Sequence, residues 1–193
     1  MDIVLLSTAG EELAVSGQDV VRLFYPDAGI HLSPETGADL TLIVAAGQEK
    51  TTLFGSAELR AGSNVFTERV KASEFLVPGE ERNHRKRLVK LALYRLLLRF
   101  QGLSAGPWGI LTGIRPTKIV HRLLDLDWSV EKILEYLTDG YDMSRDKASL
   151  LTDIALTQRQ YLMSREEAAR YVSIYIGIPF CPTRCAYCSF PSY

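Results

Sequence analysis

The segment "TTLFGSAELRAGSNVFTERVK", residues 51–71, carries the clearest strand pattern in the chain. Small or apolar side chains hold every second position of its first half, namely Leu53, Gly55, Ala57 and Leu59. A period of two is typical of a β-strand that buries one face against a core. The turn-forming sequence Gly-Ser-Asn then separates this run from a second β-prone run. Two neighbouring strands are therefore predicted, Thr51–Leu59 and Val65–Lys71.

Similar short runs extend toward the N-terminus and give further candidate strands at Ile3–Ser7, Val20–Tyr25 and Leu40–Ala45. Turn-forming Gly, Pro, Asn and Asp residues separate them. We predict a small, mostly antiparallel, β-rich accessory domain that spans residues 1–78. Because no residue pattern in this region suggests catalysis, we expect it to serve as a scaffold or docking domain.

The pattern changes to helical over residues 79–170. The stretch "EERNHRKRLVKLALYRLLLRF", residues 80–100, begins with two acids, which suit the positive end of a helix dipole. Its second half is apolar almost all round, which predicts a buried helix. Ser129 and Ser144 are expected to cap two later helices, and Gly140 to end the first of these. The predicted fold class is α+β.

A cluster of basic residues lies at the start of the first predicted helix, where "HRKR" occupies His84–Arg87 with Arg82 and Lys90 nearby. One interpretation is a solvated helix face, which is the common role of such a charge run. The other is an anion-binding patch for RNA or for a polycarboxylate substrate. The sequence leaves both interpretations open.

The segment "GPWGILTGIRPTK", Gly106–Lys118, is glycine-rich and precedes a predicted helix. It is not a phosphate-binding P-loop, because Gly113 is followed by Ile-Arg-Pro rather than by Lys and Ser or Thr. A tight turn between domains accounts for the glycines without a ligand. A contact surface formed by Trp108 and Arg115 is the alternative.

Composition limits the kind of protein that this chain can be. Its 193 residues are 47% apolar and 23% charged, which is typical of a globular protein with a sizeable core. The net charge of −1 implies no general attraction to nucleic acid or to an anionic membrane, so neither is expected as a partner. The N-terminus lacks the basic region of a signal peptide, and no apolar run is long enough to span a membrane.

All three cysteines of the chain, Cys181, Cys185 and Cys188, lie within "YIGIPFCPTRCAYCSFPSY", residues 175–193. They follow a β-branched and aromatic run, Val172–Ile178, that is predicted to be a buried strand. An odd number of clustered cysteines favours metal or redox chemistry in a reducing compartment, so the cytoplasm is the expected location.

The spacing C-x3-C-x2-C favours an iron–sulfur cluster over other uses of these thiols. A loop directly after a strand can bring three sulfurs to one centre, and thiolates are the ligands of such clusters. Three cysteines leave one iron of a four-iron cluster open to another ligand. Structural zinc needs a fourth Cys or His, and the nearest histidine is the distant His121. A disulfide between such close neighbours would be strained.

The cysteine spacing, the preceding strand and the aromatic Tyr187 together resemble the signature of radical S-adenosyl-L-methionine (SAM) enzymes. The longer string "YIGIPFCPTRCAYCSF" is similar to the subgroup of oxygen-independent coproporphyrinogen III dehydrogenases and related haem chaperones. The string "LTGIRPTKIVHRLLD" and the order of the segments resemble the HemZ branch of that subgroup. The resemblance to that branch extends over the whole chain.

This resemblance implies specific roles for residues of the motif. Cys181, Cys185 and Cys188 would ligate a [4Fe–4S] cluster, and SAM would chelate its fourth iron. Tyr187 would lie against the adenine of SAM. Tyr175 would lie near the cluster and SAM, although ordinary strand packing is an equal alternative. No catalytic residue is assigned.

The activity of the family is implied in the same way. Reductive cleavage of SAM by one electron, from a donor that is not identified, would give a 5′-deoxyadenosyl radical. In a coproporphyrinogen dehydrogenase that radical takes a hydrogen from a propionate of the porphyrinogen substrate. Carbon dioxide then leaves and a vinyl group remains.

The sequence departs from the best-defined members at Phe190, where those carry a further cysteine. The haem chaperones and the HemZ branch share this departure. Two further functions therefore stay open beside the dehydrogenase. One is a haem-binding protein that keeps the cluster motif, and the other is a radical SAM enzyme for another substrate, to which the N-terminal region adds an RNA- or protein-docking module.

In the family, the cluster loop follows the first strand of a (β/α) barrel, whose active site lies at the carboxyl ends of its strands. Residues 171–193 are thus expected to be the first strand and cluster loop of a truncated barrel. We expect the chain to be a fragment that does not turn over alone.

Overall fold

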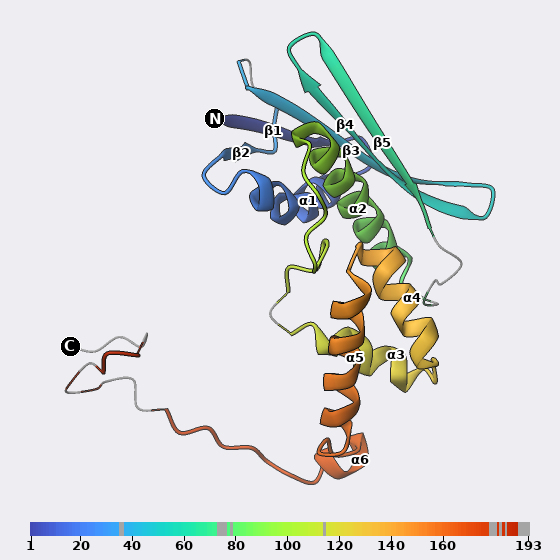
Figure 1. Cartoon of the computed structure of the whole chain (residues 1–193), viewed down its shortest axis with the longest axis vertical. Helices are drawn as coiled ribbons and strands as arrows, with labels where there is room; N and C mark the ends of the chain where they lie inside the picture. Colours follow the sequence, from blue (N-terminus) through green and yellow to red (C-terminus); the bar gives the residue numbers. More distant parts are fainter. Residues whose placement is uncertain are drawn as a thin grey trace. The chain divides into compact units, whose positions relative to one another are not determined.

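The computed structural model describes residues 1–34, 37–72, 77, 79–113, 115–177, 181, 183 and 185–188. Contacts divide the chain into two compact units, Met1–Arg159 and Gln160–Tyr193. The first unit contains a five-stranded sheet in the order β2-β1-β3-β4-β5 (Figure 1). Its strands are β1 (Asp2–Ser7), β2 (Gly29–His31), β3 (Leu40–Glu49), β4 (Thr52–Ala61) and β5 (Asn64–Lys71).

The sheet is mixed, and the prediction of a mostly antiparallel sheet was wrong for its first half. Strand β1 pairs in parallel with both β2 and β3, whereas β3, β4 and β5 form an antiparallel meander. The parallel pairing of β1 and β2 requires a crossover connection, because a tight turn reverses the chain. Helix α1 (Glu11–Phe24) supplies that crossover. The α+β class is confirmed.

The predicted strand Val20–Tyr25 was therefore wrong, since Val20–Phe24 form the last turns of α1. The buried residues of this helix repeat with helical spacing and are Leu13, Ala14, Gly17, Val20 and Val21. The six residues Val20–Tyr25 are mostly β-branched or aromatic, as residues of a strand commonly are. The helical spacing of the buried residues can be recognised only over the whole length of α1. Glu11 and Glu12 stabilise its start through the helix dipole.

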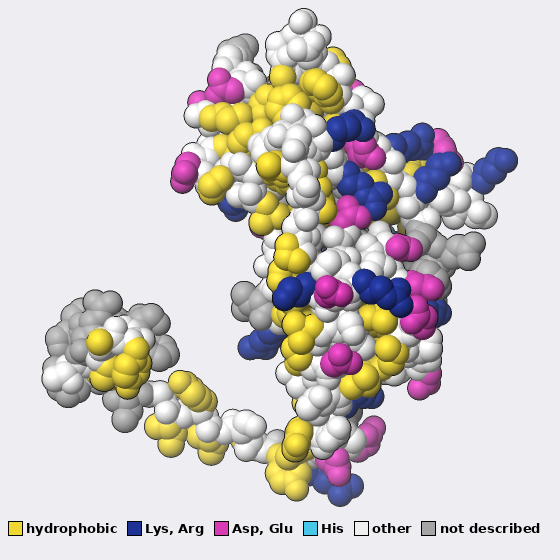
Figure 2. Space-filling model, in the orientation of Figure 1, with side chains coloured by type: hydrophobic (Ala, Val, Ile, Leu, Met, Phe, Trp, Pro, Cys, Tyr) yellow, Lys and Arg dark blue, Asp and Glu magenta, His cyan; other side chains and the backbone are white. Residues whose placement is uncertain are grey.

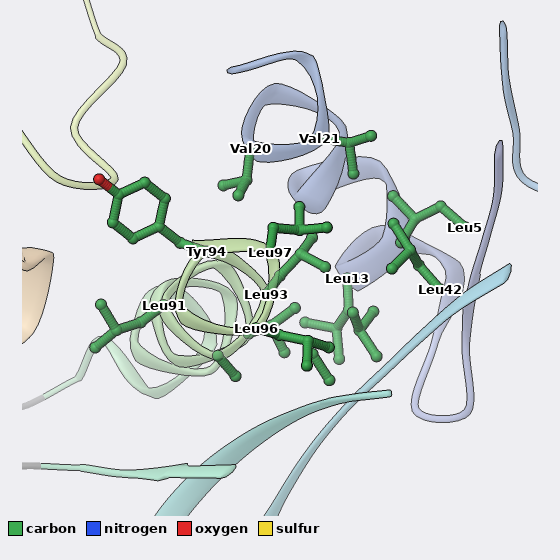
Figure 3. Close-up of a cluster of buried hydrophobic side chains, with 14 of the residues drawn as sticks. Leu5, Leu13, Val20, Val21, Leu42, Leu91, Leu93, Tyr94, Leu96 and Leu97 are labelled. Carbon is green, nitrogen blue, oxygen red and sulfur yellow. The ribbon is translucent and has the colours of Figure 1, made fainter. Parts of the chain in front are cut away.

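The alternation that opened the sequence analysis is confirmed in β4, where Leu53, Ala57 and Leu59 are buried. Strand β3 alternates in the same way along its first seven residues. Helices α1 and α2 (Glu81–Gln101) cover the face of the sheet that these side chains share (Figure 1). Figure 3 shows Leu97 of α2 pointing toward Val20 and Val21 of α1, which closes the core between the two helices.

Helix α2 approaches β4 so closely that the position facing it must be glycine. A Cβ atom built on Gly55 would lie 2.4 Å from the backbone carbon of Leu88 and 2.6 Å from the backbone nitrogen of Val89. Real Cβ atoms do not come so near to backbone atoms, and the backbone cannot move aside as a flexible side chain can. The expected burial of the second half of α2 is confirmed, from Leu88 to Leu97.

A second group of buried side chains lies between three later helices, which are α3 (Thr117–Asp125), α4 (Val130–Tyr141) and α5 (Arg145–Arg159). Ser129 caps α4 as predicted, since its hydroxyl accepts from the Lys132 amide at 3.3 Å. Gly140 does not end α4, which continues to Tyr141 before Asp142 adopts a left-handed conformation. The Asp142 carboxylate accepts two hydrogen bonds from Arg95, at 2.8 and 2.5 Å, and so ties α4 to α2.

The second unit contains one short helix, α6 (Arg165–Ala168), in its described part. The backbone of residues 172–177, which are the described part of Val172–Ile178, forms no strand. The strand predicted there was wrong for residues 172–177, and Ile178 lies outside the described residues. A strand needs a neighbour for its backbone N–H and C=O groups, and this segment pairs with none. None of the helices in the described part of the chain combines the length and the apolar character that a membrane span requires.

Candidate functional site

The three cysteines follow this extended segment and carry free thiols. Cys181 and Cys185 are exposed and Cys188 is half-buried. The Cys188 amide donates to the Cys185 carbonyl at 3.0 Å, which folds the last two cysteines into one turn. The sequence prediction placed all metal ligands here, and the loop offers three accessible sulfur donors with no disulfide among them.

The donor chemistry of the loop fits an iron–sulfur cluster, because three thiolates are the soft ligands that such clusters take. The described residues, however, do not gather these thiols into a metal-holding group, nor any other three His, Cys, Asp or Glu side chains. The ligands of a metal site are commonly brought together only when the metal binds, because metal binding is coupled to the folding of the site. The loop thus has the right donors without a preformed cage.

The two tyrosines assigned to cofactor binding are also accessible. Tyr175 is 94% exposed and Tyr187 is 92% exposed. The apolar side chains beside Tyr175 are exposed too, at 88% for Val172, 82% for Ile174 and 84% for Ile176. Figure 2 shows these apolar side chains along the extended stretch after α6. An apolar run of this kind is typical of a surface that another part of a protein covers.

The glycine-rich segment Gly106–Lys118 joins α2 to the later helices. The Gly106 amide donates to the Tyr94 hydroxyl at 2.7 Å, and the Ile110 amide donates to the Tyr141 carbonyl at 2.9 Å. Gly109 has a φ of +53°, and a Cβ atom there would lie 1.9 Å from that same carbonyl oxygen. The glycines therefore allow close backbone packing. Trp108 is 36% exposed, so the contact surface proposed for it remains a prediction.

The basic cluster at the start of α2 divides between two faces of the helix. Three of its outward side chains bind acids on α1. Arg82 Nε donates to Glu12 at 2.8 Å, and Lys86 Nζ lies 3.5 Å from the same carboxylate. Lys90 Nζ lies 3.4 Å from Asp19. These cations hold α2 against α1, where two carboxylates offset part of their charge.

The other face of the cluster carries His84 and Arg87, which are buried at 2% and 7% exposed. Arg87 Nη2 donates to His84 Nδ1 at 3.1 Å. A guanidinium can only donate, so Nδ1 is the acceptor in this contact. On the other side of the ring, the Val77 amide donates to Nε2 at 2.9 Å, and the Val77 carbonyl lies 3.1 Å from the same nitrogen.

The sequence interpretation missed this inward pair. A signal was present, because His84 and Arg87 share the helix face of Leu88 and Leu91 at the spacing i, i+3, i+4, i+7. A basic residue on an apolar face is a candidate buried charge. The run of four basic letters concealed the fact that two of them belong to the core.

A cavity of about 160 Å³ opens beside this pair, between α2, α3 and α4. Its polar lining comes from Glu80, Asn83, His84, Arg87, Arg122 and Tyr136. Burial is the main cause that lowers the pKa of His84, and the positive charges of Arg87 and Arg122 lower it further. The hydrogen bond to the Val77 backbone and the charge of Glu80 act in the opposite direction. The imidazole is therefore held neutral. Burial also raises the pKa of the Tyr136 hydroxyl, which stays protonated.

Comparison with known proteins gives one informative relative. No family model matches the chain. The chain is 33% identical over 177 residues to a Bacillus subtilis (strain 168) protein named oxygen-independent coproporphyrinogen-III oxidase-like protein HemZ. The match covers 91% of this chain and 35% of that protein, so the chain spans about a third of the relative's length. The similarity supports the HemZ-like resemblance seen in the sequence.

Proposed function

We propose that this chain is part of a HemZ-like radical SAM protein and that Cys181, Cys185 and Cys188 hold its [4Fe–4S] cluster. The observation that carries the proposal is the confinement of every thiol of the chain to one eight-residue loop, where all three are free. The similarity to HemZ over most of the chain is independent support.

The residues of the loop have distinct roles in this proposal. The three thiolates occupy three coordination positions and leave a fourth for SAM. When bound, the cluster and SAM supply a one-electron route to hydrogen-atom abstraction from an unactivated carbon. Tyr187 offers an aromatic face to the adenine of SAM, and its exposed ring is free to do so. Tyr175 precedes the loop by six residues, and we assign it to the same cofactor surface.

The substrate class follows from the name of the relative. We propose that the full-length protein acts on a porphyrinogen, with oxidative decarboxylation of propionates to vinyls as the reaction and an electron donor as its partner. The exposed apolar run Val172–Gly177 would then be covered by further strands of a barrel. Residues 1–159 form an accessory region whose described part contains no cluster ligand.

A haem-binding function is the second candidate, and Phe190 keeps it open. This position carries no sulfur, whereas the best-defined dehydrogenases place a further cysteine there. Phe190 lies outside the described residues, so the argument rests on the sequence alone. A protein of this second kind would keep the cluster motif and bind haem without changing the porphyrinogen.

One experiment separates the two functions. The full-length protein is reconstituted anaerobically with iron and sulfide and incubated with SAM, a reductant and coproporphyrinogen III, and product masses are recorded. Loss of two carboxyl groups with matching 5′-deoxyadenosine supports the dehydrogenase. Unchanged porphyrinogen in the presence of a reducible cluster contradicts it, and a parallel haem titration then tests the second candidate.

A further inference from the structure

Strand β5 forms an open edge of the five-stranded sheet, since it is the last strand in the order and pairs with β4 (Figure 1). The opposite edge is β2, which has three residues, whereas β5 has eight. A long open edge is a template on which a strand of another molecule can pair, and natural proteins protect such edges. An edge of the length of β5 therefore needs protection.

The backbone groups that β5 presents at this edge follow from its turn with β4. Ala61 pairs with Asn64 across a two-residue turn. The residues that flank such a turn form a hydrogen-bonded pair, and hydrogen-bonded pairs recur at every second residue. The N–H and C=O groups of the alternate residues therefore point away from β4, toward the open edge, and these residues are Val65, Thr67, Arg69 and Lys71.

Arg99, near the end of α2, occupies one of these edge groups. Its Nη2 atom donates to the backbone carbonyl of Thr67, and its Nη1 atom donates to the Glu68 carboxylate at 2.8 Å. A guanidinium is a rigid planar fork, so one end can bind the carboxylate while the other binds the carbonyl. The side chain of Glu68 is 21% exposed, against 54% for Arg99. The more buried carboxylate thus holds the guanidinium over the strand edge.

The neighbouring residue of α2 fixes the same part of the helix against β5. The ring of Phe100 meets the ring of Phe66 edge to face, with the centroids 5.3 Å apart. Both rings pack against the hydrophobic core. Arg99 therefore projects from a helix end that is anchored on β5, so less conformational freedom is lost when its side chain binds the edge.

Thr67 lies at the centre of the pairing that a second copy of β5 could form with this edge. Two copies of one strand pair in antiparallel fashion about a two-fold axis, so the residue at the axis faces itself. With Thr67 at the axis, residues 64–70 of the two copies overlap. In this register the charged residues Glu68 and Arg69 each face an apolar residue, so no like charges are opposed.

Other registers of the same two strands are less favourable. With Glu68 or Arg69 at the axis, that residue faces its own copy, and like charges directly opposite each other are destabilising. With Phe66 at the axis, the overlap shrinks to residues 64–68. The register centred on Thr67 is therefore the longest that the charges permit. Its central hydrogen bonds require the Thr67 carbonyl, which Arg99 occupies.

We propose that Arg99 closes the β5 edge and so prevents two copies of the protein from joining their sheets through this strand. The Thr67 amide of an incoming copy needs the same carbonyl, and the guanidinium lies in its path. Displacing Arg99 would break a charge-assisted hydrogen bond and leave a cation beside the new interface. This role of Arg99 is independent of the cluster loop and of the function proposed above.

Sedimentation of the full chain over a range of concentrations tests the proposal, with a reductant present because the exposed thiols could otherwise link two molecules. We expect the parent to remain monomeric and Arg99→Met to associate about tenfold more tightly or better, since it loses the charge-assisted hydrogen bond. Arg22→Met, at an exposed position of α1, makes the same change of charge and should remain monomeric. Circular dichroism establishes that each variant is folded.

Thr67→Pro shows whether the association uses the β5 edge. Proline at this position removes an N–H that the pairing with β4 does not use, and edge strands tolerate proline at such positions. Combined with Arg99→Met, it removes the central hydrogen bonds between the two copies, so the double variant should be monomeric again. The proposal is overturned by a monomeric Arg99→Met, by a parent that associates equally strongly, or by association that persists in the double variant.

Discussion

The environment of a charged side chain on α2 depends on the face of the helix to which it belongs. Arg82, Lys86 and Lys90 face α1 and bind its carboxylates, whereas His84 and Arg87 face the cavity at the junction with α3 and α4. The four adjacent basic residues His84–Arg87 therefore lie in two different environments. The outer pairs are exposed and contribute little to stability individually, whereas His84 and Arg87 are buried against the core.

His84 predicts how the stability of the protein responds to acid. Burial lowers its folded-state pKa below the ordinary value of 6.5. Above pH 6.5 the histidine is neutral in both states, and its contribution to stability is fully present. As the pH falls from there through the folded pKa, only the unfolded state takes up the proton, so the free energy of unfolding decreases.

Urea unfolding at pH values from 7.5 to 5 measures this dependence. We expect His84→Gln to be less stable overall and to have a flatter slope over this range. An unchanged slope in His84→Gln would contradict the assignment of the acid sensitivity to this residue.

The cysteine loop gives a second prediction at the scale of single residues. Replacing Cys181, Cys185 or Cys188 by Ala should reduce bound iron to a small fraction of the parent value after anaerobic reconstitution, because three ligands leave no spare donor in the loop. Thr183→Ala, within the same loop, should keep its iron. Iron and sulfide analysis with electron paramagnetic resonance provides the measurement. Full iron retention in a cysteine variant would rule that cysteine out as a ligand.

At the scale of elements, the contact between β4 and α2 makes Gly55 a sensitive position. Gly55→Ala must push two backbones apart, so we expect a loss of about 1–3 kcal/mol or more in the free energy of unfolding. Gly113→Ala is a matched control, since a Cβ atom at that position meets nothing within 4 Å. Denaturant midpoints measured for both variants provide the test. Equal midpoints would show that the helix can shift on the sheet without cost.

The elements also show which parts of the fold the sequence could predict. The alternation in β4 and the cap at Ser129 depend on neighbours along the chain, so they were predicted correctly. The parallel pairing of β1 depends on partners far away in sequence, and α1 was partly mistaken for a strand because its β-branched end was considered alone.

The candidate functional residues also differ in whether local sequence signals could identify them. Cysteine spacing is a local signal, so the loop could be named from sequence, and the structure adds that its thiols are free and ungathered. The pocket at Arg87 needs residues from α2, α3 and α4. The spacing of His84 and Arg87 with Leu88 and Leu91 was the one sequence signal that these two basic residues face the core. No pattern in the neighbouring sequence indicates that Arg122 lies beside them.

At the scale of the whole molecule, the division into two units predicts that Met1–Arg159 folds alone. Both hydrophobic clusters consist entirely of residues within that range. A protein comprising residues 1–159 should therefore unfold cooperatively with a Tm within about 2 °C of the value for residues 1–193. Removal of α5 as well should lower the Tm strongly, since Leu151 and Ala155 belong to the second cluster. A large drop on removal of residues 160–193 alone would show that they stabilise the first unit.

The interior position of β1 in the sheet has a consequence for synthesis on the ribosome. This strand emerges before both of its neighbours, since β3 begins only at Leu40 and β2 follows the whole of α1. The meander from β3 to β5, by contrast, pairs segments that leave the exit tunnel one after another. We therefore expect the nascent chain to expose Ile3, Val4 and Leu5 until the meander offers an edge, which makes this apolar strand a binding site for chaperones during translation.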